Sequence, residues 1–135
     1  MDYTGLLNEH NKYIEVLDKL ESKTEYIEIV LIDGKDTNEL VDYLKDDILK
    51  IDYVSSWWGT EISDKNKLIR IKSSIKLFNK LRMYETFCKY YESVKGDYSE
   101  VTDFGYDDIA FYDKSNNILL CTTTHEGAIM FDESK

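Results

Sequence analysis

The sequence predicts an α+β domain in which a mixed or antiparallel sheet of five to six strands carries two to three packed helices. Segments with helical spacing of apolar residues are interspersed with short, strand-like segments, and the two types do not alternate regularly. This order excludes a simple doubly wound parallel fold. The C-terminal part contains three short apolar runs separated by turn residues, which predicts a β-meander.

Length and composition indicate one globular domain spanning residues 1–135. Hydrophobic residues make up 42% of the chain and proline is absent, so neither a disordered chain nor a proline-rich linker is expected. Cys88 and Cys121 are interpreted as buried free thiols, with a disulfide between them as the alternative. The N-terminus lacks the basic and apolar regions of a signal peptide, and no apolar run approaches the roughly 20 residues that span a bilayer. We therefore expect a cytoplasmic protein without a membrane segment.

The first two elements are a helix and a buried strand. Residues 3–22 have apolar positions at three- and four-residue steps, which predicts an amphipathic helix with His10 on or near its apolar stripe. Residues 25–33 are apolar at both odd and even positions, and a strand of that kind is covered on both faces. We expect this strand at the centre of the sheet.

A second helix is predicted over residues 37–50. Asp36 is the expected N-cap, and Glu39 stands three residues later as its capping-box partner. The expected inner face of this helix is apolar and consists of Leu40, Val41, Leu44 and Ile48.

Two strands separated by a polar loop should follow. Residues 51–58 form the first strand, residues 60–66 the loop, and residues 67–72 an alternating strand with Ile69 and Ile71 on one face. The two strands are expected to pair as a hairpin.

The third helix is predicted over residues 74–93 and should be the longest. Ser73 or Ser74 caps it, and Gly96 closes it before an acidic loop. The helix should present an apolar face to the sheet.

The meander should comprise strands near 108–113, 117–124 and 128–132. The last connection contains His125 and Glu126, and Gly127 suits the left-handed position of a three-residue hairpin loop. His125 is then a loop-tip residue, for which contact with a partner is a better interpretation than chemistry.

The net charge is −10, which argues against nucleic acid as the default partner. Residues 65–89 are the exception, because they hold eight basic residues and one acidic residue. On one helix Lys72, Lys76 and Lys80 would share a stripe and repel one another. In one interpretation, acidic groups of the same chain compensate these positive charges. In the other, the block is a second binding face.

A metal site is a second hypothesis for the acidic C-terminal region. Carboxylates and one histidine can hold Mg²⁺ or Mn²⁺, although their spacing matches no known ligand loop. The sequence also lacks phosphate-binding, nucleophile-elbow and zinc motifs. We therefore expect no cofactor and no enzymatic activity, and keep a metal-dependent hydrolase or nuclease as the alternative. Its residues would be Asp103, Asp107, Asp108, Asp113, His125 and Glu126.

Trp57 and Trp58 are adjacent in a predicted strand, so their side chains should point to opposite faces. One can enter the core, and an exposed partner would be a typical anchor at a protein interface. Burial of both between two covered faces is the alternative.

The C-terminal stretch "DDIAFYDKSNNILLCTTTHEGAIMFD" resembles the end of small acidic bacterial immunity proteins. The resemblance covers about a fifth of the chain and consists of a hairpin pattern. It implies a cytoplasmic, non-enzymatic protein that binds and neutralises one cognate toxin. It carries over no binding residues.

Charge and resemblance together predict an acidic protein that blocks a basic partner, such as a toxin nuclease, by covering its active site. Such an inhibitor is expected to be a monomer or a homodimer. A non-enzymatic regulatory homodimer is a further alternative function. Carboxylates would replace phosphates and an aromatic ring would fill a pocket. The expected contact residues are Asp42, Asp46, Trp57, Trp58, Asp103, Tyr106, Asp107, Asp108 and His125.

Overall fold

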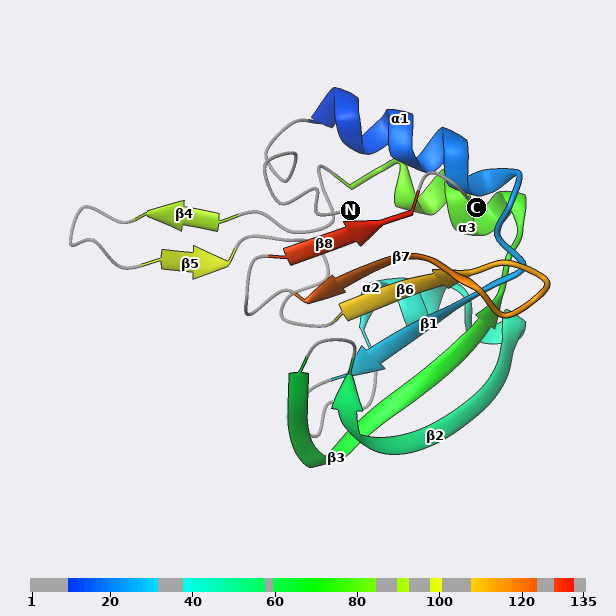
Figure 1. Cartoon of the computed structure of the whole chain (residues 1–135). Coiled ribbons are helices and arrows are strands. Elements are labelled where there is room, and N and C mark those ends of the chain that lie inside the picture. Colours follow the sequence, from blue (N-terminus) through cyan, green and yellow to red (C-terminus); the bar gives the residue numbers. More distant parts are fainter. Residues whose placement is uncertain are drawn as a thin grey trace.

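The computed structural model describes residues 10–31, 38–57, 60–84, 90–92, 98–100, 108–123 and 128–132. Within them, three α-helices accompany a six-stranded antiparallel sheet, which confirms the predicted α+β fold and its C-terminal meander (Figure 1). The elements in chain order are α1 (His10–Glu21), β1 (Tyr26–Leu31), α2 (Glu39–Tyr43), the 3₁₀-helix η2 (Lys45–Asp47), β2 (Ile48–Trp57), β3 (Thr60–Lys72), α3 (Ile75–Leu81), β4 (Tyr90–Glu92), β5 (Tyr98–Glu100), β6 (Asp108–Tyr112), β7 (Ile118–Thr123) and β8 (Ala128–Phe131).

The strand order is β2-β3-β1-β6-β7-β8, and β4 and β5 form a separate two-stranded ribbon. β1 pairs antiparallel with β3 on one side and with β6 on the other. All six residues of β1 are buried, as its apolar residues at both odd and even positions predicted for a central strand. β1, from the first third of the chain, therefore joins a strand from the middle third to a strand from the last third.

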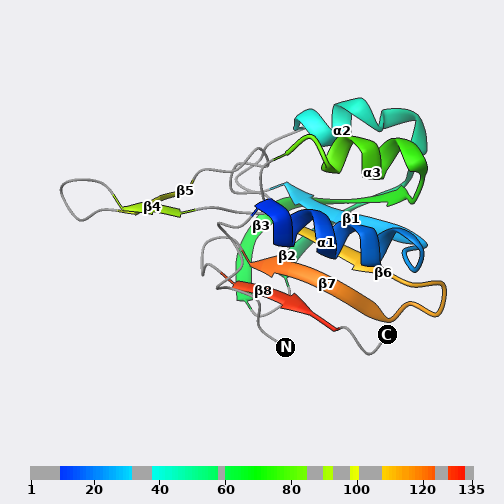
Figure 2. The same ribbon diagram turned by 90° about the horizontal axis from the view of Figure 1, so that it is seen from above.

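The helices pack on one face of the sheet (Figure 2). Alternate residues of β1 point toward them, and Ile27, Ile29 and Leu31 are completely or almost completely buried there. The helices contribute apolar side chains at helical spacing to the same core. These include Tyr13, Leu17 and Leu20 of α1, Leu40 and Val41 of α2, and Leu77, Phe78 and Leu81 of α3.

The opposite, helix-free face carries a second, smaller apolar cluster. The Trp57 Nε1–H group, at the end of β2, donates a hydrogen bond of 2.7 Å to the backbone oxygen of Thr122 in β7. β2 and β7 are separated by three strands in the sheet order, so the curved β2–β3 hairpin reaches across this face (Figure 1). The cluster beneath it comprises Tyr26, Val30, Trp57, Ala110, Tyr112 and Cys121.

The second predicted helix is much shorter than residues 37–50. It ends at Tyr43 and is followed by the single 3₁₀ turn of η2, because Ile48 already pairs with Ile71 as the first residue of β2. Asn38 is the N-cap, and its side-chain oxygen accepts a hydrogen bond of 2.8 Å from the Val41 backbone. The predicted cap, Asp36, lies outside the described residues.

The third predicted helix is also too long. Ser74 caps it as expected, since its Oγ accepts a hydrogen bond of 3.0 Å from the Leu77 backbone, but α3 has seven residues against twelve in α1. Residues 90–92, expected in the helix, form β4 and pair with β5. Tyrosine-rich segments favour strands, and here sheet pairing replaces the helical pattern.

The polar segment 60–66 is not a loop. It is the first half of β3, which runs continuously to Lys72 and forms with β2 the expected hairpin. Asn66 lies opposite Val54 and is fully buried. Pairing with β2 thus places these residues in a strand, although their polarity predicted a loop.

Candidate functional site

The residues expected to contact a partner divide into three groups. Asp42 in α2 and Asp46 in η2 are exposed, as a binding role requires. Trp57 and Asp108 are buried. The remaining predicted contact residues lie outside the described residues, namely Trp58, Asp103, Tyr106, Asp107 and His125.

The expectation for Trp57 and Asp108 is therefore corrected. Trp57 closes the apolar cluster of the helix-free face, and its side chain is buried there. Asp108 is 2% exposed, and its Oδ1 accepts a hydrogen bond of 2.8 Å from Thr122 Oγ1. That hydroxyl also accepts one of 3.1 Å from the Ile109 backbone. Asp108 thus holds β6 and β7 together and presents no carboxylate to a partner.

The proposed metal cluster has two members within the described residues, and both serve the fold. Asp108 is buried, and Asp113 shapes the β6–β7 turn by accepting hydrogen bonds of 2.9 Å from the Ser115 and Asn117 backbones. Asn116 between them has φ of 64°, a left-handed value that asparagine tolerates. In the part of the chain that the structure describes, no three His, Cys, Asp or Glu residues are grouped to hold a metal.

The basic block at residues 65–89 pairs with acidic groups of the same chain. Lys80 Nζ lies 2.6 Å from Glu39, Lys72 Nζ lies 3.9 Å from Asp47, and Lys76 lies over the Tyr43 ring. Lys72 belongs to β3, so the three lysines do not share the predicted helical stripe. Arg82 in turn pairs with Asp18 and Glu21 of α1. These contacts support the interpretation of the block as an internal ion-pair surface.

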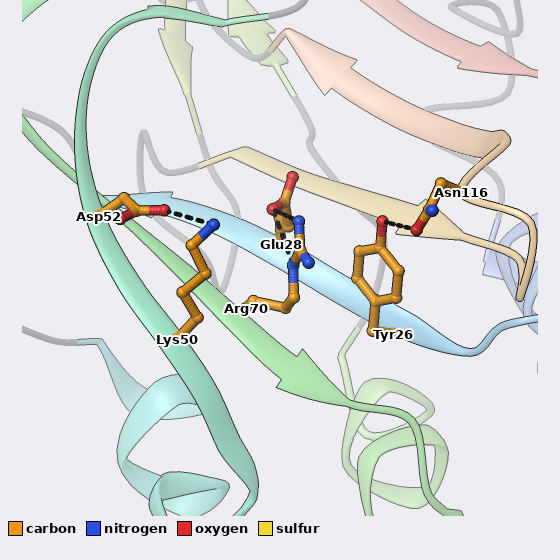
Figure 3. Close-up of polar contacts among 6 residues, drawn as sticks. All are labelled: Tyr26, Glu28, Lys50, Asp52, Arg70 and Asn116. Atoms are coloured by element: carbon orange, nitrogen blue, oxygen red, sulfur yellow. Dashed lines mark hydrogen bonds and ion pairs between the residues drawn. The ribbon is translucent and has the colours of Figure 1, made fainter.

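A row of polar side chains crosses the helix-free face from β2 to β1 (Figure 3). Arg70 on β3 donates to Glu28 on β1 at 2.9 and 3.2 Å, and its guanidinium lies 4.3 Å from the centre of the Tyr26 ring. Lys50 and Asp52 on β2 form an ion pair of 3.0 Å. The Glu28 carboxylate is nearly buried and therefore depends on Arg70 for compensation of its charge.

The margin formed by α2, η2 and β2 combines carboxylates with exposed apolar side chains. Asp42 and Asp46 lie on its helical part. Its exposed large apolar residues are Tyr43, Leu49, Ile51 and Tyr53. Apolar residues alternate with polar ones at positions 49, 51 and 53. This alternation is the sequence signal that could have identified a half-exposed strand face here.

Cys121 is buried in the helix-free cluster, and burial together with the Asp108 charge raises the pKa of its thiol to about 11. In a Cys88→Ser background we expect a thiol reagent to modify native Cys121 far more slowly than the unfolded chain. Because the folded thiol stays neutral to a higher pH than the unfolded thiol, the free energy of unfolding should fall as pH rises from about 9 to 11.

The rate of alkylation with and without denaturant checks the protection of the thiol. The melting temperature as a function of pH, measured for the Cys121 and Cys121→Ala forms, checks the pH dependence of stability. The difference between the two melting curves isolates the thiol from the many tyrosines and lysines that titrate nearby. Equal alkylation rates for native and unfolded protein would contradict the burial of the thiol.

Comparison with protein-family models, with curated proteins and with solved structures finds no match for this chain. Among the described residues, no helix combines the length and apolar character needed to cross a membrane. The functional interpretation accordingly depends on the charges and contacts of the chain itself.

Proposed function

We propose that this chain is an acidic binding protein that neutralises a basic protein partner. The observation that carries the proposal is the exposure of Asp42 and Asp46 on the α2–η2 segment of a chain whose net charge is −10. Four basic residues of the block 65–89 form ion pairs within the chain, so their charges are compensated there. The α2–η2 segment therefore offers negative charge to a partner.

The chemistry of the α2–η2 segment suits recognition of a cationic surface. Lys80 and Lys76 lie over or beside the Tyr43 ring and keep one side of this segment compact. Asp42 and Asp46 face solvent on the same short segment, which the Asn38 cap fixes at its start. Carboxylates whose backbone is fixed in short helical segments lose less conformational entropy when they pair with lysine or arginine side chains.

A bacterial toxin, including a nuclease, is the partner class that fits best. Proteins that act on nucleic acids carry basic grooves, and a partner of charge −10 is attracted to such a groove from a distance. Carboxylates then occupy positions that phosphates would take. The resemblance of the C-terminal stretch to immunity proteins points to the same class.

The experiment begins by capturing the partner of the immobilised protein from its source cell and measuring association by stopped flow. Reversal of two charges in Asp42→Lys/Asp46→Lys should slow association at low salt by about tenfold, because electrostatic steering is lost. The control Glu15→Lys/Glu25→Lys makes the same change in net charge at exposed positions on α1 and on the loop that follows it, and should slow association much less.

The proposal also requires that the captured protein is basic and that its activity is lost when the acidic protein is added in equal amount. An association rate that does not depend on salt, or equal slowing by both double variants, would refute the role of the α2–η2 surface.

A further inference from the structure

Strand β2 forms one margin of the sheet. Among the described strands it hydrogen-bonds with β3 alone, and its ten residues make it more than twice as long as β8 at the other margin. Three of its apolar side chains are prominently exposed, with Leu49 at 57%, Ile51 at 49% and Tyr53 at 70%. A long edge with apolar side chains is a template for pairing with another strand.

The sequence of β2 is self-complementary around Ile51. If two copies pair antiparallel with Ile51 opposite Ile51, Lys50 of each copy faces Asp52 of the other and Leu49 faces Tyr53. Opposite charges and apolar pairs directly across an antiparallel ladder stabilise it. We propose that this chain forms a homodimer through β2–β2 pairing in this register, which joins the two sheets edge to edge.

The charges select this register over its neighbours. Successive side chains of a strand alternate between its two faces, so a shift of the β2–β2 register by two residues keeps the same faces together. The two nearest registers of this kind place Lys50 opposite Lys50 or Asp52 opposite Asp52. Centring on Lys50 places two lysines opposite each other, and centring on Asp52 does the same with two aspartates. Like charges directly opposite destabilise a ladder. The register around Ile51 alone among the three pairs each lysine with an aspartate.

The charges on the neighbouring strand support the same arrangement. Lys50 lies directly opposite Arg70 of β3, so two cations are adjacent on the helix-free face (Figure 3). Glu28 compensates Arg70, and Asp52 of the same strand compensates Lys50. In the dimer a second carboxylate, from Asp52 of the other copy, reaches Lys50. The polar row then continues from one sheet into the next.

The backbone of β2 permits the pairing. Its ladder with β3 is regular from Lys50 to Val54, and the irregularities fall outside this span, between Ile48 and Lys50 and between Val54 and Ser56. The Ile51 pair and the two Lys50–Asp52 pairs of the dimer therefore lie on regular strand, and Leu49 lies at the first irregularity. Asp42 and Asp46 precede β2 and take no part in the ladder, so the dimer presents two acidic surfaces. The inference is independent of the proposed function.

Charge reversal tests the register directly. Lys50→Asp places two aspartates opposite each other at two symmetry-related sites, and Asp52→Lys does the same with lysines. Each variant alone should dimerise about tenfold more weakly than the native chain in sedimentation experiments over a range of concentrations. An equal mixture of the two variants should restore dimers, because each aspartate then faces a lysine of the other variant.

Two further proteins complete the test. The double reversal Lys50→Asp/Asp52→Lys should dimerise like the native chain, and Lys12→Asp, at an exposed position on α1, should leave the dimer unchanged. Lys50 and Asp52 are about half exposed, so melting temperatures near the native value will verify that the variants fold. A native chain that sediments as a monomer at every concentration, or a mixture that gains no dimer, overturns the proposal.

Discussion

Phe111→Ala is expected to lower the free energy of unfolding by about 3–5 kcal/mol. Phe111 is fully buried on β6, beside the central strand, and its ring lies 6.1 Å from that of Phe78 in α3. Removing the ring leaves a cavity where the sheet meets the helix layer, and such cavities close only in part. Domains of this size are stable by about 5–15 kcal/mol, so the loss is a large share of the total.

Urea denaturation followed by circular dichroism measures this loss. Met83→Ala is the control, because this side chain is also large and apolar but 75% exposed, and its removal should change stability by about 0.5 kcal/mol or less. A loss for Phe111→Ala no greater than that of the control would contradict the position of Phe111 in the core.

Arg70→Met is expected to cost about 3 kcal/mol, the second largest effect. The substitution keeps much of the apolar stem but removes the only charge that donates to Glu28 in the hydrogen bonds described above. The Glu28 side chain is 11% exposed, so its carboxylate would remain nearly buried without compensation. The contact of the guanidinium with the Tyr26 ring is lost as well.

A double-mutant cycle separates the ion pair from the packing. If the uncompensated carboxylate causes most of the loss, Arg70→Met/Glu28→Met should be more stable than the sum of the single effects allows. The same unfolding measurements on four proteins give the coupling energy. Additive effects would show that Glu28 and Arg70 contribute separately.

Several elements were predictable because local pattern and tertiary environment agree. The apolar residues at both odd and even positions of β1 match its burial on both faces, and the alternation of Ile69 and Ile71 matches their position under the helices. The meander was equally clear, since turn residues such as Asp113 separate its strands and hold the turn through side-chain hydrogen bonds.

The errors occurred where long-range pairing decides the structure. The helical spacing of residues 37–50 continues into a segment that pairs with β3 instead, so the helix ends at Tyr43. The polar residues of 60–66 are extended because β2 lies beside them. A single sequence shows the local preference of such segments but not the strand that will compete for them.

The candidate site was predictable only in part, for a similar reason. Asp42 and Asp46 are exposed as expected for residues on a short polar helix face. Asp108 has the same chemistry, but its position opposite Thr122 hides it inside the sheet. The adjacent pair of cations Lys50 and Arg70 arises from β2–β3 register, which composition does not encode.

The central position of β1 has a consequence for the order in which the chain can fold as it is synthesised. β1 emerges from the ribosome early, but one of its edges pairs with β3 and the other must wait for β6, whose last residue is Tyr112. During that interval a largely apolar strand has an unpaired edge, which is the kind of surface that chaperones bind and aggregates recruit. Translation speed through residues 73–107 should therefore influence the yield of native protein.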